Sequence, residues 1–94
     1  MNKLLWETAD EIIMNLALKV KRIRKRRNIS QEILSKMSDV SLGSIKRFET
    51  TGQISLISLV KIAISLDIID EIRNLFTEVE YLSIDEVLNE NKQN

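Results

Sequence analysis

The sequence predicts an all-α domain. The 94 residues contain no Pro and only two Gly, while Leu, Ile, Lys and Glu are abundant, a composition that favours helices. Apolar residues also recur at helical spacing in segments that begin with a Ser or Thr suited to capping a helix. We expect one domain over residues 1–76, with helices at about 8–27, 31–37, 41–50, 55–66 and 69–76.

The first helix is expected to begin at a capping box. Thr8 and Glu11 have the spacing at which each side chain bonds the backbone of the other residue. The predicted buried stripe of this helix consists of Ile12 or Ile13, Leu16, Val20 and Ile23. Asn28 can take the left-handed conformation that ends a helix. In the preceding arm, Trp6 is expected to fold back over one end of the core, with contact to a partner as the alternative.

Residues 30–50 are predicted to form two short helices joined by a tight turn. Ser30 and Ser41 can cap the two helices, and Asp39 tolerates the left-handed backbone that a three-residue turn often requires. The predicted buried side chains are Ile33, Leu34 and Met37 in the first helix, and Ile45 and Phe48 in the second. The opposite face of the second helix is polar, cationic or small and is therefore free to touch a partner.

The next two helices, the first of which Ser55 is expected to cap, carry more apolar residues than one small core can cover. Only Ser58, Lys61 and Ser65 interrupt the apolar segment 56–66, and a helix that is apolar nearly all round is central or covered on its outer side. We expect a homodimer contact through Ile57, Val60, Ile64, Ile68, Ile69 and Ile72. The alternative is that the N-terminal half of the first helix covers this surface within one subunit.

An acidic tail is expected at residues 77–94. A second capping box at residues 83–86 predicts a short helix at about 84–90. Alternating apolar residues make a strand over 79–84 the alternative.

The charges are divided along the chain although the formal net charge is zero. Residues 1–50 hold eleven Lys or Arg and six acids, whereas residues 51–94 hold three and eight. Residues 19–27 alone contain seven cations. Such a run is usually a solvated face, but Lys21, Lys25, Arg26 and Arg27 are candidates for contacts with closely spaced phosphates. This distribution favours a nucleic-acid partner.

Several functional classes are disfavoured by the composition. The absence of Cys and His removes disulfides, thiolate or imidazole zinc ligands, and Cys or His nucleophiles and bases. No cofactor or metal is therefore expected, and neither is an enzyme. The apolar run 54–66 is too short and too polar to span a bilayer, and nothing at the N-terminus has the pattern of a signal peptide. The cytoplasm is the expected compartment.

One run of residues carries a family resemblance. It comprises Ser30, Gln31, Leu34, Val40, Ser41, Ile45, Arg47, Phe48 and Glu49, at fixed spacing without a gap. The run resembles the helix-turn-helix of the XRE family, typified by the phage lambda and 434 repressors. Ser35 and Asp39 stand where Ala and Gly are usual. The resemblance implies a lambda-repressor-like five-helix domain, a repressor function, and an ion pair between Arg24 and Glu49.

The resemblance also implies where DNA would bind. Arg47 is the best candidate for a base contact, because its planar fork matches guanine O6 and N7. Leu42 would pack on a thymine methyl group, and Gly43 would permit close approach. The full set of expected DNA contacts is Gln31, Ser41, Leu42, Gly43, Ser44, Lys46, Arg47, Thr51 and Gln53. A dimer would place two such helices about 34 Å apart on an inverted-repeat operator in double-stranded DNA.

A narrower resemblance lies in residues 41–56 together with the Leu- and Ile-rich helix that follows. This stretch looks like the HipB-like antitoxins, which are encoded beside HipA-type kinase toxins. That resemblance implies an antitoxin that regulates its own promoter and binds the kinase. A phage-type repressor, a controller of a restriction-modification system, and a helical protein-interaction module without DNA binding are the alternatives.

Overall fold

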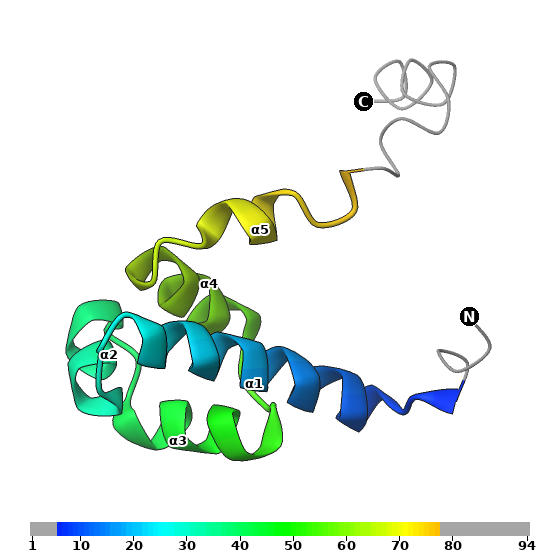
Figure 1. Cartoon of the computed structure of the whole chain (residues 1–94), viewed down its shortest axis with the longest axis horizontal. Helices are drawn as coiled ribbons and strands as arrows, with labels where there is room; N and C mark the ends of the chain where they lie inside the picture. Colours follow the sequence, from blue (N-terminus) through cyan, green and yellow to red (C-terminus); the bar gives the residue numbers. More distant parts are fainter. Residues whose placement is uncertain (1–5, 78–94) are drawn as a thin grey trace.

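The computed structural model describes residues 6–77, which form five α-helices and no strand (Figure 1). The helices are α1 (Ala9–Arg26), α2 (Gln31–Ser38), α3 (Leu42–Thr51), α4 (Leu56–Ser65) and α5 (Ile69–Arg73). α3 packs beside α1 and runs in the opposite direction, α2 contacts both α3 and α4, and α5 packs on α4. The predicted all-α class is therefore confirmed for these residues. The helix predicted at 84–90 and its strand alternative lie outside them.

Each of the first four helices begins at a side-chain cap. The Thr8 hydroxyl accepts from the Glu11 backbone amide at 3.1 Å, and the Glu11 carboxylate accepts from the Thr8 amide at 3.2 Å. The hydroxyls of Ser30, Ser41 and Ser55 each accept from the amide three residues later. These four caps are the ones predicted. The expected left-handed residues are also present, with φ of 57° at Asn28 and 59° at Asp39.

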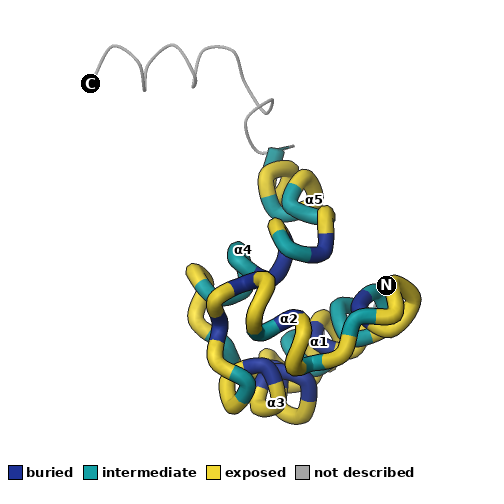
Figure 2. Tube along the Cα trace, turned by 90° about the vertical axis from the view of Figure 1, so that its left-hand side faces the viewer, coloured by how far each residue is buried: buried dark blue, intermediate teal, exposed yellow. Residues whose placement is uncertain are grey.

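The hydrophobic core lies where α1 to α4 meet. Its buried side chains are Ala17, Leu34, Val40, Ile45, Phe48, Ile62, Ala63 and Leu66. Figure 2 colours segments of α1 to α4 as buried, while α5 has only exposed and half-buried residues. Ile45 and Phe48 point inward as predicted, so the opposite side of α3 faces out.

The buried stripe predicted for α1 was wrong in part. Leu16 is 50% exposed, and the neighbouring Ala17 is fully buried instead. Ile13 is half-buried, whereas Ile12 is 45% exposed. Because α1 has apolar residues on more than one side, the side that becomes buried depends on the helix that packs against it. α3 packs against the side that contains the small Ala17.

Three further predictions were wrong, two about apolar burial and one about the end of α5. In α2 only Leu34 is fully buried, while Ile33 and Met37 are about half exposed. Trp6 is 76% exposed and therefore does not seal the core. α5 ends at Arg73, before the predicted residue 76, and Phe76 has φ of 62°, which is incompatible with a continuing right-handed helix.

The C-terminal end of α3 lies directly on the backbone of α1. Gly52 ends α3 with φ of 82°. A Cβ atom at this position would lie 2.7 Å from the carbonyl carbon of Ile13 and 2.8 Å from its oxygen. Only glycine fits here, because any other residue would meet both the strained φ and the backbone of α1. The close contact fixes the distance between α1 and α3.

No helix within the described residues 6–77 has both the length and the apolar character needed to cross a membrane.

Candidate nucleic-acid interface

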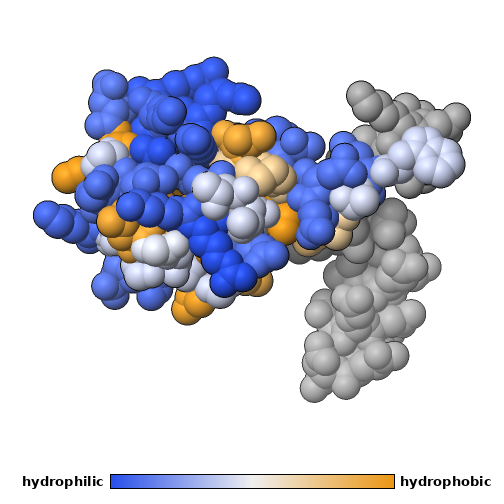
Figure 3. Space-filling model, turned by 90° about the horizontal axis from the view of Figure 1, so that it is seen from below, coloured by the Kyte–Doolittle hydropathy of each residue, from blue (hydrophilic) through white to orange (hydrophobic). Residues whose placement is uncertain are grey.

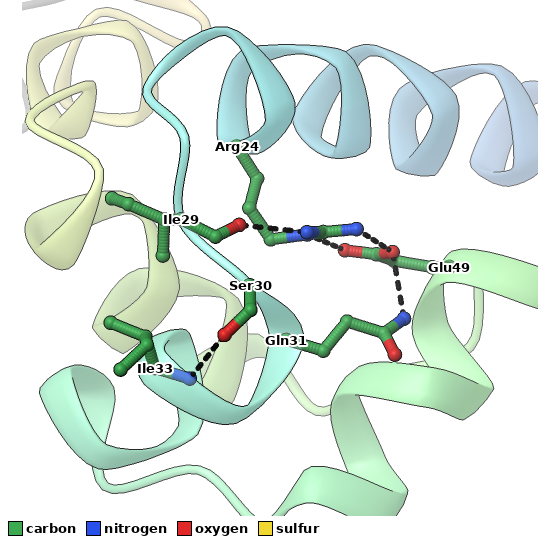
Figure 4. Close-up of polar contacts among 6 residues, drawn as sticks. All are labelled: Arg24, Ile29, Ser30, Gln31, Ile33 and Glu49. Atoms are coloured by element: carbon green, nitrogen blue, oxygen red, sulfur yellow. Dashed lines mark hydrogen bonds and ion pairs between the residues drawn. The ribbon is translucent and has the colours of Figure 1, made fainter.

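A buried network of polar side chains fixes α3 to α1 and α2 (Figure 4). Arg24 of α1 donates from Nε to Glu49 Oε2 at 2.7 Å and from Nη2 to Glu49 Oε1 at 2.8 Å. Its Nη1 donates to the Ile29 carbonyl at 2.8 Å, and Gln31 Nε2 donates to Glu49 Oε1 at 2.9 Å. The ion pair implied by the family resemblance is therefore present, and a contact from α2 supplements it.

The network is fully paired despite its burial. Arg24 and Glu49 are 6% and 4% exposed, and no buried side-chain nitrogen or oxygen among the described residues lacks a hydrogen-bond partner. Burial raises the pKa of the Glu49 carboxyl, but the hydrogen bonds from Arg24 and Gln31 and the positive charges of Arg24 and Lys21 outweigh it. The pKa of Glu49 therefore lies below its ordinary value, which keeps the carboxylate ionised.

The turn between α2 and α3 is closed by two serines. The Ser35 hydroxyl donates to the Val40 carbonyl at 2.6 Å. The Ser38 hydroxyl donates to the Leu34 carbonyl at 2.7 Å and accepts from the Val40 amide at 3.3 Å. Asp39 between them holds the left-handed conformation. The turn is therefore tight although Ser35 and Asp39 depart from the usual residues of the resembling family.

The outer face of α3 is uncovered by the rest of the described chain. The exposed residues at the predicted contact positions are Ser41, Gly43, Ser44, Lys46, Arg47, Thr51 and Gln53, and Leu42 is half-buried. A Cβ atom added at Gly43 would meet nothing within 4 Å. Seen from the α3 side, the molecule is mainly hydrophilic with scattered apolar patches (Figure 3). The structure thus brings these residues together on one accessible polar surface.

Gln31 has a different environment from the other predicted contacts. It is half-buried, and its amide nitrogen donates to Glu49. Because a carboxamide nitrogen carries two hydrogens, one remains for a further acceptor. Gln31 therefore contributes to the buried network in addition to any surface contact.

A shallow hollow lies beside Arg47, at the junction of α3 with the start of α4. It is lined by Ser44, Arg47, Gln53, Ile54, Ser55 and Ser58. Ser55 and Ser58 were not among the predicted contacts, because the sequence showed Ser55 only as a helix cap. Neither this hollow nor any other part of residues 6–77 groups three His, Cys, Asp or Glu side chains suited to a metal ion.

The cationic side chains in the last turns of α1 are exposed to solvent, except those close to the buried Arg24–Glu49 pair. Lys25, Arg26 and Arg27 are exposed, whereas Lys21 is half-buried and contributes to lowering the pKa of Glu49. Positive charge is thus available on α1 as well as on Lys46 and Arg47 of α3.

An apolar surface lies on α4 and α5, away from the outer face of α3. Leu56, Ile57 and Ile64 are 70%, 67% and 60% exposed, while the polar residues Ser58 and Lys61 of the same helix are half-buried. The other predicted interface residues, Val60, Ile68, Ile69 and Ile72, are half-buried. In both Figure 1 and Figure 2, α5 lies apart from α1. The alternative in which α1 covers this surface was therefore wrong.

Comparisons with known proteins do not place the chain in a family: no family model matches it, and no match was found among curated proteins or solved structures.

Proposed function

We propose that this chain is a sequence-specific DNA-binding transcriptional regulator, in which α2 and α3 form a helix-turn-helix of the lambda-repressor type. The observation that carries the proposal is the exposed polar face of α3, on a helix whose inner face is fixed by the buried Arg24–Glu49 pair. The major groove of B-DNA, about 12 Å wide, admits one α-helix. A helix entering it needs an accessible polar face and a rigid support, and α3 has both.

In this proposal α3 lies in the major groove and reads base edges. Arg47 donates from its guanidinium to guanine O6 and N7, and Leu42 packs on a thymine methyl group. Ser41, Ser44 and Lys46 contact bases or phosphates. The absence of a side chain at Gly43 lets the helix backbone approach the groove floor closely.

Backbone phosphates supply the remaining attraction. Lys25, Arg26 and Arg27 at the end of α1 are exposed, and long cationic side chains of this kind contact phosphates. The free amide hydrogen of Gln31 is available for a phosphate beside α2. Thr51 and Gln53, at the end of α3, extend the same surface.

We further propose that two copies pair through α4 and α5 and read an inverted repeat. The exposed Ile57 and Ile64 stand seven positions apart on one side of α4, and the half-buried Val60 lies between them. Apolar side chains exposed in this number favour burial against a second protein surface. A second copy presents the same apolar residues, so the two surfaces match in chemistry and in symmetry.

The prediction that the chain is a HipB-like antitoxin stays a prediction. It depends on the residues of segment 41–56 and on the presence of surface available to a second protein, such as the exposed Trp6. Copurification of the full chain with the product of its neighbouring gene would test it. A HipA-type kinase in the complex supports the antitoxin, and a phage or restriction gene alongside supports one of the alternative regulators.

The DNA-binding proposal is tested by selecting preferred duplexes from a random library with the full chain. Affinity for the selected and for random duplexes is then measured over a range of salt concentrations. We expect affinity for the selected duplex to fall steeply with salt, because cations displace counterions from the phosphates. The absence of any salt-sensitive duplex binding would favour a helical protein-interaction module instead.

Replacement of Arg47 by Ala is the sharpest variant in this experiment. We expect a cost of about 1 to 3 kcal/mol on the selected duplex and a relaxed preference at one base pair in each half-site. Arg73→Ala is the matched control, because Arg73 is an exposed arginine on α5, outside the proposed DNA contacts. Equal losses for Arg47→Ala on selected and random duplexes would contradict a base-reading role.

A further inference from the structure

The side chain of Gln53 accepts a hydrogen bond from the residue proposed to read a base. Oε1 of Gln53 accepts from Nη2 of Arg47, and both side chains are exposed. Gly52 makes this contact possible, because its left-handed φ of 82° turns the chain back toward the face of α3. Two residues six positions apart in sequence thereby become neighbours on the proposed DNA-binding surface.

The backbone of Gln53 is itself fixed to the same turn of α3. Its amide donates to the Thr51 hydroxyl at 3.1 Å, and that hydroxyl donates to the Arg47 carbonyl at 2.7 Å. Arg47, Thr51 and Gln53 are therefore linked in a closed ring by three hydrogen bonds. Through residues 51–53, the ring connects the backbone carbonyl of Arg47 to the guanidinium of the same residue.

We propose that Gln53 is a positioning residue that holds the Arg47 guanidinium in place for base reading, and that Thr51 supports it. The inference rests on the proposed function and changes the expected role of both residues, which were predicted to contact DNA directly. A free arginine side chain samples many rotamers, and ordering it on binding weakens the complex. A hydrogen bond already formed in the free protein removes part of that cost.

The chemistry of the two groups suits this role. A guanidinium carries five N–H donors, so one bond to Gln53 leaves enough donors for a two-pronged contact with guanine. The carboxamide oxygen of Gln53 is neutral and orients the guanidinium without cancelling its positive charge. A carboxylate at the same position would also accept the bond, but it would repel the phosphates.

The test compares Gln53→Met, which has similar size but no acceptor, with Gln53→Glu, which keeps an acceptor and adds a charge. Both are made in the full chain and measured on the selected duplex and on its variants at the base pair that Arg47 reads. We expect Gln53→Met to weaken that single base preference by about two- to tenfold. We expect Gln53→Glu to keep the preference while losing affinity for all duplexes.

Two controls separate positioning from direct contact. In an Arg47→Ala background, Gln53→Met should have no further effect on the preference at that base pair. Lys46→Met, which removes a neighbouring exposed cation, should lower the salt dependence of binding and leave the preference at the base pair that Arg47 reads unchanged.

The outcomes distinguish this inference from the function it rests on. If Arg47→Ala relaxes the preference but Gln53→Met weakens all duplexes equally, Gln53 contacts a phosphate directly; the positioning role is overturned and the regulator stands. If the unmodified chain selects no preferred duplex, both proposals are overturned. Circular dichroism of each variant verifies folding. Because Gln53 is exposed, we expect its substitutions to leave the fold intact.

Discussion

Arg24 and Glu49 lie 25 positions apart in the sequence and form a buried two-pronged ion pair between α1 and α3. The carboxylate also accepts from Gln31, so three helices meet at one side chain. Removing water from two charges is costly, and hydrogen bonds to every buried nitrogen and oxygen of the pair offset that cost. Loss of one partner therefore leaves the other charge buried without compensation.

Replacement of Arg24 by Met is expected to lower the free energy of unfolding by about 3 to 5 kcal/mol, since it leaves the Glu49 carboxylate without its cation. Urea unfolding followed by circular dichroism measures the loss. Arg73→Met is the matched control, because Arg73 pairs with Asp70 at 3.3 Å on the exposed surface. That control should cost less than about 1 kcal/mol. Similar losses of unfolding free energy for the two variants would show that the buried ion pair contributes no more to stability than the exposed one.

The lowered pKa of Glu49 predicts a specific loss of stability in acid. An unfolded glutamate has a pKa of about 4.3, and the folded value lies below it because Arg24 and Gln31 stabilise the carboxylate. The stabilisation is therefore complete above about pH 4.3 and is lost as the pH falls through the folded pKa. Glu49→Gln should be less stable than the unmodified chain at pH 7 and should lose stability less steeply below about pH 4. Urea unfolding across this range provides the measurement, and parallel curves for the two proteins would refute the prediction.

Replacement of each of the two glycines by alanine is expected to have opposite effects on stability. At Gly52, alanine would meet both the left-handed φ and the Ile13 backbone, so we expect a loss of about 2 to 4 kcal/mol of stability. At Gly43 the added methyl group meets nothing, so Gly43→Ala should be neutral or stabilising by up to about 1 kcal/mol. Thermal unfolding of both variants and of the unmodified chain measures these changes in stability. A Gly52→Ala protein as stable as Gly43→Ala would contradict the close approach of α3 to α1.

The proposed dimer predicts that a carboxylate introduced on the apolar surface of α4 separates the subunits without unfolding them. Ile57 and Ile64 are 67% and 60% exposed in the single chain, so Ile57→Glu and Ile64→Glu leave the core intact. We expect self-association to weaken at least about tenfold, because the dimer would bury an unpaired carboxylate. Met37→Glu, at a half-exposed position on α2, is the control. Sedimentation over a concentration series measures the effect, and a monomeric unmodified chain would overturn the dimer.

The features predicted correctly from the sequence are local ones. The capping bond between Thr8 and Glu11 involves residues three positions apart, and the left-handed turn at Asp39 depends on the residue itself. The inward face of α3 was also predictable, because Ile45 and Phe48 are, apart from Leu42 at its first position, the large apolar residues in a mostly polar helix. Such signals need no knowledge of what packs against the segment.

The features that were missed depend on contacts between distant segments. Leu16 and Ala17 are both apolar, and only the approach of α3 decides which of them is buried. The sequence places Gln31 at the start of a helix but does not show that its amide reaches Glu49, 18 positions later. Likewise, the contact between Arg47 and Gln53 exists only because the chain reverses at Gly52.

The meeting of three helices at Glu49 has a mechanical consequence. Tilting or sliding of α3 would break its bonds to both α1 and α2, so we expect the proposed DNA-binding helix to be stiff. When a stiff protein and a flexible duplex are brought together, bending and twisting fall on the duplex. Operators would then be ranked partly by how easily their base steps yield, including steps that no side chain touches.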